Sequence, residues 1–557
     1  MRSNYRNGST KIKIYLSPNI NETIPIPMNN KNNILRWLTG VAAVVMFSQF
    51  LTAQNVYNII DYGAVANKTI ISTSAIQRAV DSCAANGGGT VYFPPGDYLS
   101  GTILLKDNIT LFLEAGATLY ASRDTSDYIR PLKHTQKSAL IYANNVQNIS
   151  LRGKGKIHGQ AVHVYEELRE IDSFITDITE NARTAGVEMK RYYITPPNIF
   201  LLLLTDSQNI LIEDISLVES PFWTCHLLRC EQVTVRGVYI YSSLEKGVNA
   251  DGLDISSCKN VTVSDCTIIT GDDAIVLKTR DRERTPCENI TVTNCIISSS
   301  STALKLGTES KGDFRHILFN NCVIRDSNRG LSIVVRDGAT VSDVVFSNIT
   351  IDTRRRHFNW WGNGDPIWIY LNKRRETSPE GMIKNVVFEN IIAHAEGTSK
   401  IESFLGKRIS NIKLKNVQIL MKPESYPDKR ADHAFVANNV IGLTLDDLEV
   451  RWTEDITEEK WGNALRLENV DDLNINQFRG RQGLIASADP AIFLENIAGG
   501  QITNANAAEG TGTFLSIAGK RSSAIILKNI DLQNYSRQKL QVATEFENTL
   551  PFINLDE

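Results

Sequence analysis

The chain has 557 residues, 42% of them hydrophobic, so it could form two or three ordinary domains or one long repeat array with a large core. Its formal net charge of -3 leaves no broad basic field. Nucleic acid is therefore excluded as the expected partner, and the charge gives no sign of a membrane-surface protein.

The first informative segment is an apolar run from Leu35 to Ala53, with Lys31 and Arg36 at its front. This pattern favours a secretory signal peptide over a single membrane anchor, because "LTAQ" resembles a cleavage site and no stop-transfer charge cluster follows. Translation from Met28 would shorten the long segment ahead of the apolar run. We therefore expect residues 1–53 to be a signal region, and the mature protein to be exported, periplasmic or extracellular, with no stable membrane span.

A helix is predicted over Thr73 to Gly89, "TSAIQRAVDSCAANGGG". Thr73 or Ser74 can serve as its N-cap, and Asn86 with Gly87 provides the stop. Its apolar residues recur at helical spacing and are Ala75, Ile76, Ala79, Val80 and Cys83. Because a stack of strands has an open end that must be covered, we expect this helix to cap the N-terminal end of the fold.

Most of the remaining chain repeats one nine-residue pattern. The pattern begins at Asn209, "NILIEDISL", and returns at offsets of 23, 28, 29, 27, 27, 42 and 26 residues up to Asn411, "NIKLKNVQI". Each unit holds two short runs of alternating apolar residues, rich in Val, Ile and Thr and separated by Asn, Asp and Gly. Such runs are typical of strands, and the Leu framework of leucine-rich repeats is absent.

The fold class predicted from this repeat is all-β: a right-handed parallel β-helix with one coil per unit and an N-terminal capping helix. A β-sandwich with accidental periodicity is the alternative. Less regular segments continue the coils nearly to the C-terminus, so residues 54–557 are expected to form a single domain. Two loop insertions are expected in it, near 161–197 and 352–384.

Eight cysteines in an exported chain would suggest disulfides, but the repeat argues otherwise. Three of them take a position that Ile215 and Val238 fill in other coils, so we expect thiols in the core. These three are Cys266, Cys295 and Cys322. A second column, explained best by stacking of small apolar groups, consists of Cys230, Cys258 and Cys287.

The second strands of four successive coils can be aligned in the sequence. Because the coils stack in register, residues at equal offsets in this alignment are expected to be neighbours in space. The four segments are "ADGLDIS" from Ala250, "DDAIVLK" from Asp272, "STALKLG" from Ser301 and "NRGLSIV" from Asn328. One inward-facing column consists of Leu253, Ile275, Leu304 and Leu331, and another of Ile255, Leu277, Leu306 and Ile333. The polar columns face outward and place Asp251 beside Asp272 and Asp273.

Carboxylates this close should repel one another, which raises at least one pKa and leaves a carboxyl able to hold a proton near neutral pH. Such a group can act as a general acid while its ionised partners activate water, as in glycoside hydrolysis. Asp251, Asp272 and Asp273 are therefore the candidate catalytic residues. Gly252 and Ala274 are expected to leave a shallow floor beside them. Turn capping and calcium binding are the alternatives for such acids.

Two motifs resemble those of glycoside hydrolase family 28, the polygalacturonase family. "NADG", Asn249 to Gly252, is similar to the family's Asn-Thr-Asp-Gly motif, and "GDD", Gly271 to Asp273, to its Gly/Gln-Asp-Asp motif. "SPFWTCHLL" and "GGGTVYFPPGDY" also resemble bacterial members, and the likeness spans about residues 55 to 420. The resemblance implies a parallel β-helix and inverting hydrolysis without a metal. Asp272 would match the general acid, and Asp251 and Asp273 the pair that positions the attacking water.

The chain departs from two further motifs of this family. The Gly-His-Gly motif should fall at Ser301 to Ala303, where Thr302 replaces the histidine, and the Arg-Ile-Lys motif should fall where "SIV" stands. In polygalacturonases these cations are associated with the substrate carboxylate, so their loss argues against plain homogalacturonan. Lys278, Lys305 and Arg329 supply positive charge in neighbouring coils, either as partners of the acids or as contacts for an anionic sugar.

Five more residues are candidate substrate contacts. Asn249 belongs to the first motif, and Arg336, in "VVRDG", offers a further cation. Trp360 and Trp361 follow three arginines in "TRRRHFNWW", which would form a wall beside a sugar-binding groove or pin the loop to its coil. His226 is either a subsite residue or, as we favour, a packed histidine.

The leading expectation is an exported inverting glycosidase that cleaves an acidic plant polysaccharide or oligosaccharide of pectic type, such as rhamnogalacturonan or polygalacturonate. The insertion 161–197 would close one end of its groove and favour exo cleavage. We expect no cofactor, no metal, a carbohydrate substrate as the partner, and a monomer. A polysaccharide lyase that uses calcium and a basic proton acceptor is one alternative. A non-catalytic carbohydrate-binding β-helix is another.

Overall fold

The computed structural model describes residues 55–130, 135–168, 176–356, 362–485, 487–531, 535–542 and 553–554. The chain divides after Asn55 into two units, and nearly all the described residues belong to the second, Val56–Glu557. The predicted signal region, residues 1–53, lies outside the described residues, so its assignment stays a prediction. The second unit holds the fold and the candidate site.

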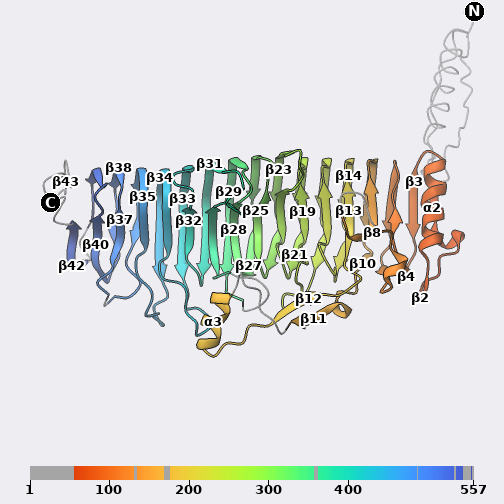
Figure 1. Cartoon of the computed structure of the whole chain (residues 1–557), viewed down its shortest axis with the longest axis horizontal. Coiled ribbons are helices and arrows are strands. Elements are labelled where there is room, and N and C mark those ends of the chain that lie inside the picture. The colour runs from red at the N-terminus through yellow and green to blue at the C-terminus, as the bar shows by residue number, and fades with distance from the viewer. Residues whose placement is uncertain are drawn as a thin grey trace, which may run out of the picture. The chain divides into compact units, whose positions relative to one another are not determined.

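Within Val56–Glu557, one sheet of 41 strands runs from β1 (Val56–Asn58) to β43 (Ile553–Asn554). Each strand pairs in parallel with its counterparts in the coils before and after it, as β20 (Lys259–Ser264) does with β17 (Glu231–Arg236) and β23 (Cys287–Thr293). The coils stack in chain order along one axis (Figure 1). The predicted all-β fold, a right-handed parallel β-helix, is confirmed.

The nine-residue repeats form one column of strands. The first residue of each repeat turns the chain at the same place in every coil. The φ angle is 55° at Asn209, 57° at Asn260 and 59° at Asn289, a conformation that Asn adopts more readily than apolar residues do. The Asn289 side-chain amide donates to Asn260 Oδ1 at 2.9 Å. The polar residue that opens each repeat therefore sets both the turn and a ladder of side chains along the stack.

The second column of strands has the predicted register. Leu253 pairs with Ile275, Ile275 with Leu304, and Leu304 with Leu331, and all four side chains are fully buried. The strands are β16 (Cys225–Leu228), β19 (Leu253–Ser256), β22 (Ile275–Thr279), β25 (Thr302–Ser310) and β28 (Arg329–Val335). The inward-facing columns predicted from the sequence are therefore confirmed.

The coils continue well beyond the candidate site. The segment 352–384, predicted as a loop insertion, contains β30 (Asp365–Leu371), which pairs in parallel with β28. The offset of 42 residues in the repeat therefore reflects longer turns on both sides of β30. Later strands include β31 (Met382–Ala395), β33 (Ile409–Met421), β34 (Phe435–Trp452), β35 (Leu465–Asn476), β37 (Pro490–Glu495), β40 (Thr511–Ala518) and β41 (Ser523–Lys528).

The interior of the coils is apolar and closely packed. Phe319, Phe346 and Phe388 lie in successive coils and stack with ring centroids 5.0 Å apart. All eight cysteines are buried and free, which confirms the prediction of core thiols. This rigid stack holds the turns that carry the candidate site.

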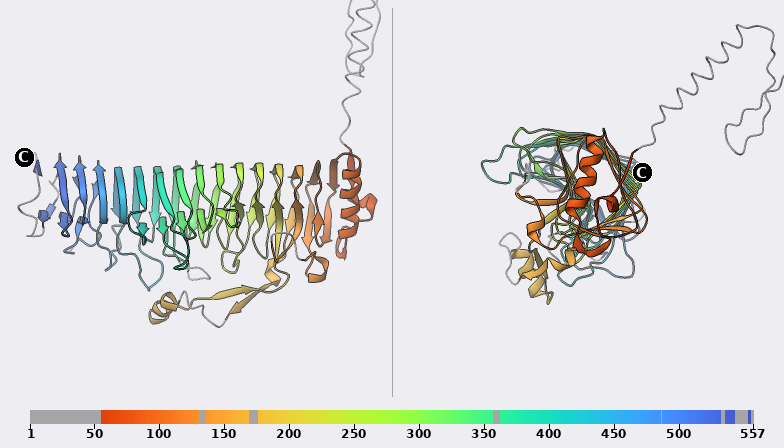
Figure 2. Two further views of the ribbon diagram at one scale, coloured as in Figure 1. Left: turned by 45° about the horizontal axis from the view of Figure 1, so that its top comes forward. Right: turned by 90° about the vertical axis from the view of Figure 1, so that its right-hand side faces the viewer.

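α2 (Thr73–Ala85) covers the N-terminal end of the stack, as predicted (Figure 2). Its apolar face, which includes Ile76 and Val80, packs into the core. The predicted N-cap is wrong by one residue, because the cap is Ser72. The Ser72 hydroxyl accepts from the backbone N of Val65 at 3.0 Å and makes no capping bond to the helix. No helix among the described residues is long and apolar enough to cross a membrane.

The insertion 161–197 forms a small structure beside the coils (Figure 2). It contains η3 (Ala161–His163), β11 (Tyr165–Leu168), α3 (Thr176–Thr184) and β12 (Arg191–Ile194), and β11 pairs with β12 in antiparallel fashion. The Tyr165 hydroxyl donates to Ser220 O at 3.0 Å, which ties the base of the hairpin to a turn of the coils. Closure of a groove by this insertion stays a prediction.

Candidate active site

The three candidate acids lie in turns that lead into neighbouring strands. Asp251 precedes β19, while Asp272 and Asp273 precede β22, which pairs with β19. One oxygen atom from each carboxylate can be chosen so that all three lie within 4.8 Å of one another. The stacking of the coils therefore brings together acids that are separated in sequence.

Glycine allows these turns to approach so closely. A Cβ atom on Gly271 would lie 2.4 Å from Ser243 O, and one on Gly252 would lie 2.5 Å from Ala274 O. Any other residue at either position would push the turns apart. The glycines of "NADG" and "GDD" are thus needed for the backbone geometry that assembles the acids.

The acids are almost completely buried. The exposed fractions of Asp251, Asp272 and Asp273 are 1%, 7% and 3%. The predicted shallow floor is wrong, because Ala274 packs in the hydrophobic core and Gly252 faces neighbouring backbone. These two small residues allow the coils to pack and do not line a surface. Asp272 has the largest exposed fraction of the three acids.

Lys278 contacts two acids at once. Its Nζ lies 2.8 Å from Asp251 Oδ2 and 2.7 Å from Asp254 Oδ1, and it also lies 3.6 Å from the centroid of the Trp223 ring. Burial would lower the pKa of Lys278, but the two carboxylates hold it well above its usual range. The ammonium group therefore stays charged inside the site.

Lys305 and Ser301 fix the position of Asp273. Lys305 Nζ lies 2.7 Å from Asp273 Oδ2, and the Ser301 hydroxyl donates to Asp273 Oδ1 at 2.8 Å. Both oxygens of Asp273 therefore have a protein partner. Lys278 and Lys305, predicted either to neutralise the acids or to bind an anionic sugar, act as partners of the acids in this structure.

Asp272 differs from its neighbours, because none of the ion pairs among the described residues includes it. Burial, followed by the charges of Asp251 and Asp273, raises the pKa of Asp272 well above its ordinary value. The lysines oppose this rise without cancelling it. Asp272 is thus suited to hold a proton and to donate it as a general acid.

Asp251 and Asp254 share the single ammonium group of Lys278. Burial raises the pKa of Asp251 and raises that of Asp254 well above its ordinary value, while Lys278 opposes the rise in each case. Since two acids compete for one cation, a proton bound here belongs to the pair and not to either acid alone. Lys278 favours an ionised carboxylate in this pair, as activation of water requires.

The carboxylates of Asp251, Asp272 and Asp273 are also the one group among the described residues with a spacing suited to a metal ion. Ammonium groups already lie 2.8 Å from Asp251 and 2.7 Å from Asp273. They supply positive charge where a divalent cation would otherwise do so. The expectation that no metal is required stays a prediction.

Two substrate-contact candidates in the following coils are buried. Thr302 is fully buried. Arg329 Nε lies 2.9 Å from Asp365 Oδ2, and its guanidinium carbon lies 3.8 Å from the centroid of the Trp368 ring. Arg329 is therefore already neutralised by an acid and covered by an aromatic ring.

His226 is packed among aromatic rings. Its ring stacks on Phe200 with centroids 5.5 Å apart and meets Trp223 edge to face at 4.9 Å, while Nε2 lies 3.0 Å from Ser256 Oγ. Burial, reinforced by nearby cations, lowers the pKa of His226 well below its usual value. The imidazole is thus neutral, and its surroundings fit the packed histidine that we favoured.

The remaining candidates lie at the edges of this region. Asn249 is half-buried in the turn before Asp251, with a φ of 53°. Arg336 is half-buried and donates from Nη2 to Lys373 O at 3.4 Å, which holds a turn. Trp360 and Trp361 lie outside the described residues, so their contact with substrate stays a prediction.

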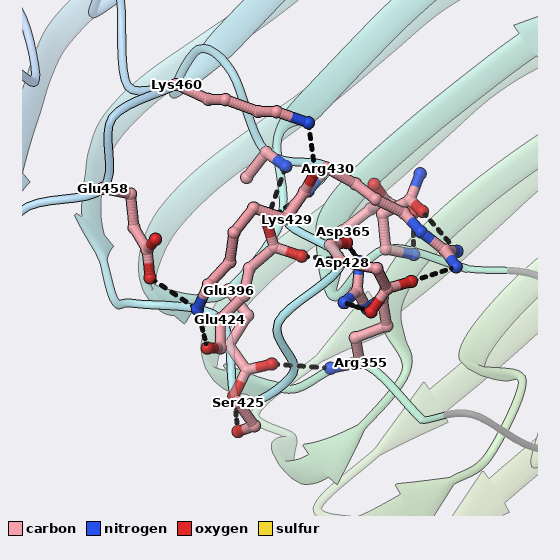
Figure 3. Close-up of polar contacts among 12 residues, drawn as sticks. Arg355, Asp365, Glu396, Glu424, Ser425, Asp428, Lys429, Arg430, Glu458 and Lys460 are labelled. Carbon is pink, nitrogen blue, oxygen red and sulfur yellow. Dashed lines mark hydrogen bonds and ion pairs between the residues drawn. The ribbon is translucent and has the colours of Figure 1, made fainter. Parts of the chain in front are cut away.

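The three arginines before these tryptophans do not form the predicted wall. Arg355 is fully buried, with Nη1 2.7 Å from Glu424 Oε2 and Nη2 2.6 Å from Asp428 Oδ1 (Figure 3). The flanking residues Arg354 and Arg356 both pair with Asp326. The arginines instead tie their turn to neighbouring acids, which fits the alternative that this loop is pinned to its coil. The part of the prediction that concerns Trp360 and Trp361 stays a prediction.

Three residues near the acids were not among the candidates predicted from the sequence. Trp223 lies against Lys278, and the exposed Arg280 lies with its guanidinium carbon 5.0 Å from the Trp223 ring centroid. Burial would raise the pKa of Glu309, but Lys278 and Arg280 lower it to about 2. The sequence could have identified Arg280 as a candidate, because this residue directly follows the strand that carries Lys278.

Comparison with known proteins agrees with the motifs. The family model described as glycosyl hydrolases family 28 matches residues 83–431, and the predicted family resemblance is confirmed. A probable polygalacturonase of Vitis vinifera is 28% identical over 237 residues, which are 40% of this chain and 44% of that protein. An exo-poly-alpha-D-galacturonosidase of Dickeya chrysanthemi is 26% identical over 280 residues, 44% of each protein. The matched regions span less than half the length of these relatives.

Solved structures share the fold. The exopolygalacturonase of Thermotoga maritima superposes with a TM-score of 0.58 at 22% identity, covering 71% of this chain and 92% of that one. The family 28 exopolygalacturonase of Yersinia enterocolitica also has a TM-score of 0.58, at 18% identity, covering 76% of this chain and 78% of that one. At these identities the likeness shows the fold alone.

Proposed function

The chain belongs to family 28 of the glycosyl hydrolases, and on this premise we propose that it hydrolyses glycosidic bonds in an acidic polysaccharide or oligosaccharide of pectic type, such as polygalacturonate or rhamnogalacturonan. The observation that carries the proposal is the cluster of Asp251, Asp272 and Asp273, with carboxylate oxygens within 4.8 Å of one another. The names of the two curated relatives support the substrate class.

In the proposed reaction Asp272 is the general acid. It protonates the glycosidic oxygen as the bond to the leaving sugar breaks, which requires a carboxyl that still holds its proton at the working pH. The raised pKa of Asp272, and the finding that no ion pair among the described residues includes it, support this role.

Asp251 and Asp273 hold and deprotonate the attacking water. A water molecule that donates a hydrogen bond of about 2.8 Å to each of two oxygens can bridge oxygens up to roughly 5 Å apart. The separation within 4.8 Å meets this condition. Lys278 and Lys305 keep the two carboxylates in place and balance part of their charge.

We propose direct attack of this water with inversion at the anomeric carbon. The carboxyl groups of inverting glycosidases commonly lie about 6.5–9.5 Å apart, and those of retaining ones about 5–5.5 Å apart. Here one oxygen of each acid lies within 4.8 Å of the others, so inversion needs the water to lie beside the acid, shared by Asp251 and Asp273. Retention would instead require one of these carboxylates to attack the sugar and form a covalent intermediate.

We further propose that the protein is exported, acts in the periplasm or outside the cell, and works as a monomer. The apolar run from Leu35 to Ala53 supports export, as does a polymeric substrate of the cell wall. Sequencing of the N-terminus of the protein recovered from outside the cytoplasm tests this, and retention of the apolar run in that protein would contradict a cleaved signal.

Incubation of the purified protein with polygalacturonate, rhamnogalacturonan and a neutral polysaccharide tests the function. We expect new reducing ends from an acidic substrate, no ultraviolet-absorbing product, and the same rate when a chelator is present. A calcium-dependent product that absorbs in the ultraviolet would indicate a lyase. Tight binding without any product would indicate a non-catalytic carbohydrate-binding protein.

A further inference from the structure

Arg280 is an exposed cation close to the acid cluster. It follows β22 directly, and its guanidinium carbon lies 5.0 Å from the centroid of the Trp223 ring. The same ring lies 3.6 Å from Lys278 Nζ, which in turn lies 2.8 Å from Asp251 Oδ2. One indole therefore connects the exposed guanidinium with the buried ammonium of the acid cluster.

Arg280 differs from the other cations in this region in how its charge is paired. Lys278, Lys305 and Arg329 each lie within 2.9 Å of an aspartate oxygen. In the described part of the chain no ion pair and no side-chain hydrogen bond of Arg280 is found. Glu309 lies within its electric field but beyond ion-pair distance. Arg280 is thus the cation near the acids that is left to bind a free anion.

Aromatic rings next to Arg280 extend this surface. Phe222 stacks on Trp223 with centroids 5.4 Å apart and planes within 7° of parallel. Lys137 Nζ lies 4.1 Å from the centroid of the half-buried Phe222 ring. Trp223 is buried, so the half-buried Phe222 ring is the one that can meet the apolar face of a sugar, while the anionic group of that sugar meets a cation beside it.

We propose, on the premise of the function proposed above, that Arg280 binds the carboxylate of a uronic acid residue in a subsite beside Asp251, next to the Phe222 and Trp223 rings. It thereby replaces the positive charge that is lost where Thr302 and "SIV" stand. A guanidinium group binds a carboxylate through two parallel hydrogen bonds, which a lysine in the same place does not reproduce.

The test measures binding by calorimetry, with trigalacturonate and its methyl ester as probes. Arg280→Gln is expected to weaken binding of the acid about 10- to 100-fold, the loss expected for a charge-assisted hydrogen bond. The same variant is expected to bind the methyl ester with the same affinity as the wild type. Arg282→Gln is the matched control, because Arg282 is an exposed arginine in the same turn, and it is expected to behave like the wild type.

Equal affinity of Arg280→Gln and Arg282→Gln for the acid would overturn the inference, as would an equal loss for acid and ester. Absence of trigalacturonate binding by the wild type would overturn it too. All the proteins compared in the calorimeter also carry Asp272→Asn, so binding is measured without turnover and this result is separate from a failure of the proposed hydrolysis. In the kinetics of an active enzyme, Arg280→Gln is expected to raise KM for the acidic substrate and to leave kcat almost unchanged.

Discussion

The ammonium group of Lys278 lies between two buried acids, 2.8 Å from Asp251 Oδ2 and 2.7 Å from Asp254 Oδ1. One cation therefore serves two carboxylates, and the side chains concerned are at most 5% exposed. This arrangement keeps an ionised acid available in a place where burial alone would protonate it.

Replacement of Lys278 by Met should leave both acids without a positive partner. Removal of one member of a buried ion pair typically lowers the free energy of unfolding by about 3–5 kcal/mol. We expect a loss of this size in urea denaturation, with a loss of activity. The double variant Lys278→Met/Asp254→Asn should recover part of the stability, because it carries one buried charge fewer. Wild-type stability of Lys278→Met would show that the contact contributes little.

The pH dependence of activity should report the raised pKa of Asp272. The folded protein binds this proton more tightly than the unfolded chain does, so the protonated acid is present at low pH and is lost as the pH rises through the raised pKa. Activity, and the contribution of this group to stability, should both fall over that range. A profile of kcat/KM against pH measures the alkaline limb.

Asp272→Asn should abolish the alkaline limb of the pH profile and lower kcat by about 10²- to 10⁴-fold, the usual contribution of a general acid. Asp265→Asn is the control, because Asp265 is an exposed acid in a nearby turn. If Asp272→Asn kept both the rate and the alkaline limb, another group would be the acid.

The register of the coils could be predicted from the sequence, because alternating Val, Ile and Thr residues must place Leu253, Ile275, Leu304 and Leu331 in one buried column. The same register predicted the meeting of the acids. Burial of these acids could not be predicted, because Trp223, which covers Lys278, belongs to a turn without periodicity. Alternation of side chains decides which face of a strand is polar, but not what covers that face.

The ion pairs that the cations form could not be predicted from the sequence either. Columns identify the residues of adjacent coils, but ion pairs also form across columns, as Lys278 does with Asp251 and Asp254. The arginines near Trp360 were predicted to contact a sugar because guanidinium groups bind the acidic groups of such sugars. Arg355 instead meets Asp428, which is 73 residues away in sequence and reaches it through a long turn of a later coil.

The buried Arg355 should be a major source of stability in this part of the stack. It is bound to Glu424 and Asp428, so Arg355→Met leaves two buried acids without this cation (Figure 3). We expect the free energy of unfolding to fall by about 3–5 kcal/mol.

Arg354→Met is the matched control, because Arg354 pairs with Asp326 at the surface, where an ion pair contributes about 0–1 kcal/mol. Urea unfolding of the two variants provides the comparison. Equal losses would contradict the role assigned to burial.

The eight free cysteines should make the fold independent of redox conditions. We expect the same Tm with and without a reducing agent, and no alkylation of the thiols until the protein unfolds, because all eight are buried. Mass spectrometry after treatment with an alkylating reagent, with and without denaturant, measures this. A Tm that falls under reduction would reveal a disulfide.

The proposed mechanism requires that Asp251 and Asp273 deliver a water molecule directly to the anomeric carbon while Asp272 protonates the leaving group. The most direct measurement is NMR of the anomeric proton of the sugar product as it first appears from an acidic oligosaccharide. Direct attack by water predicts a product of inverted configuration, which then mutarotates. A product that first appears with the configuration of the substrate would contradict it and would point to a covalent intermediate on one of these acids.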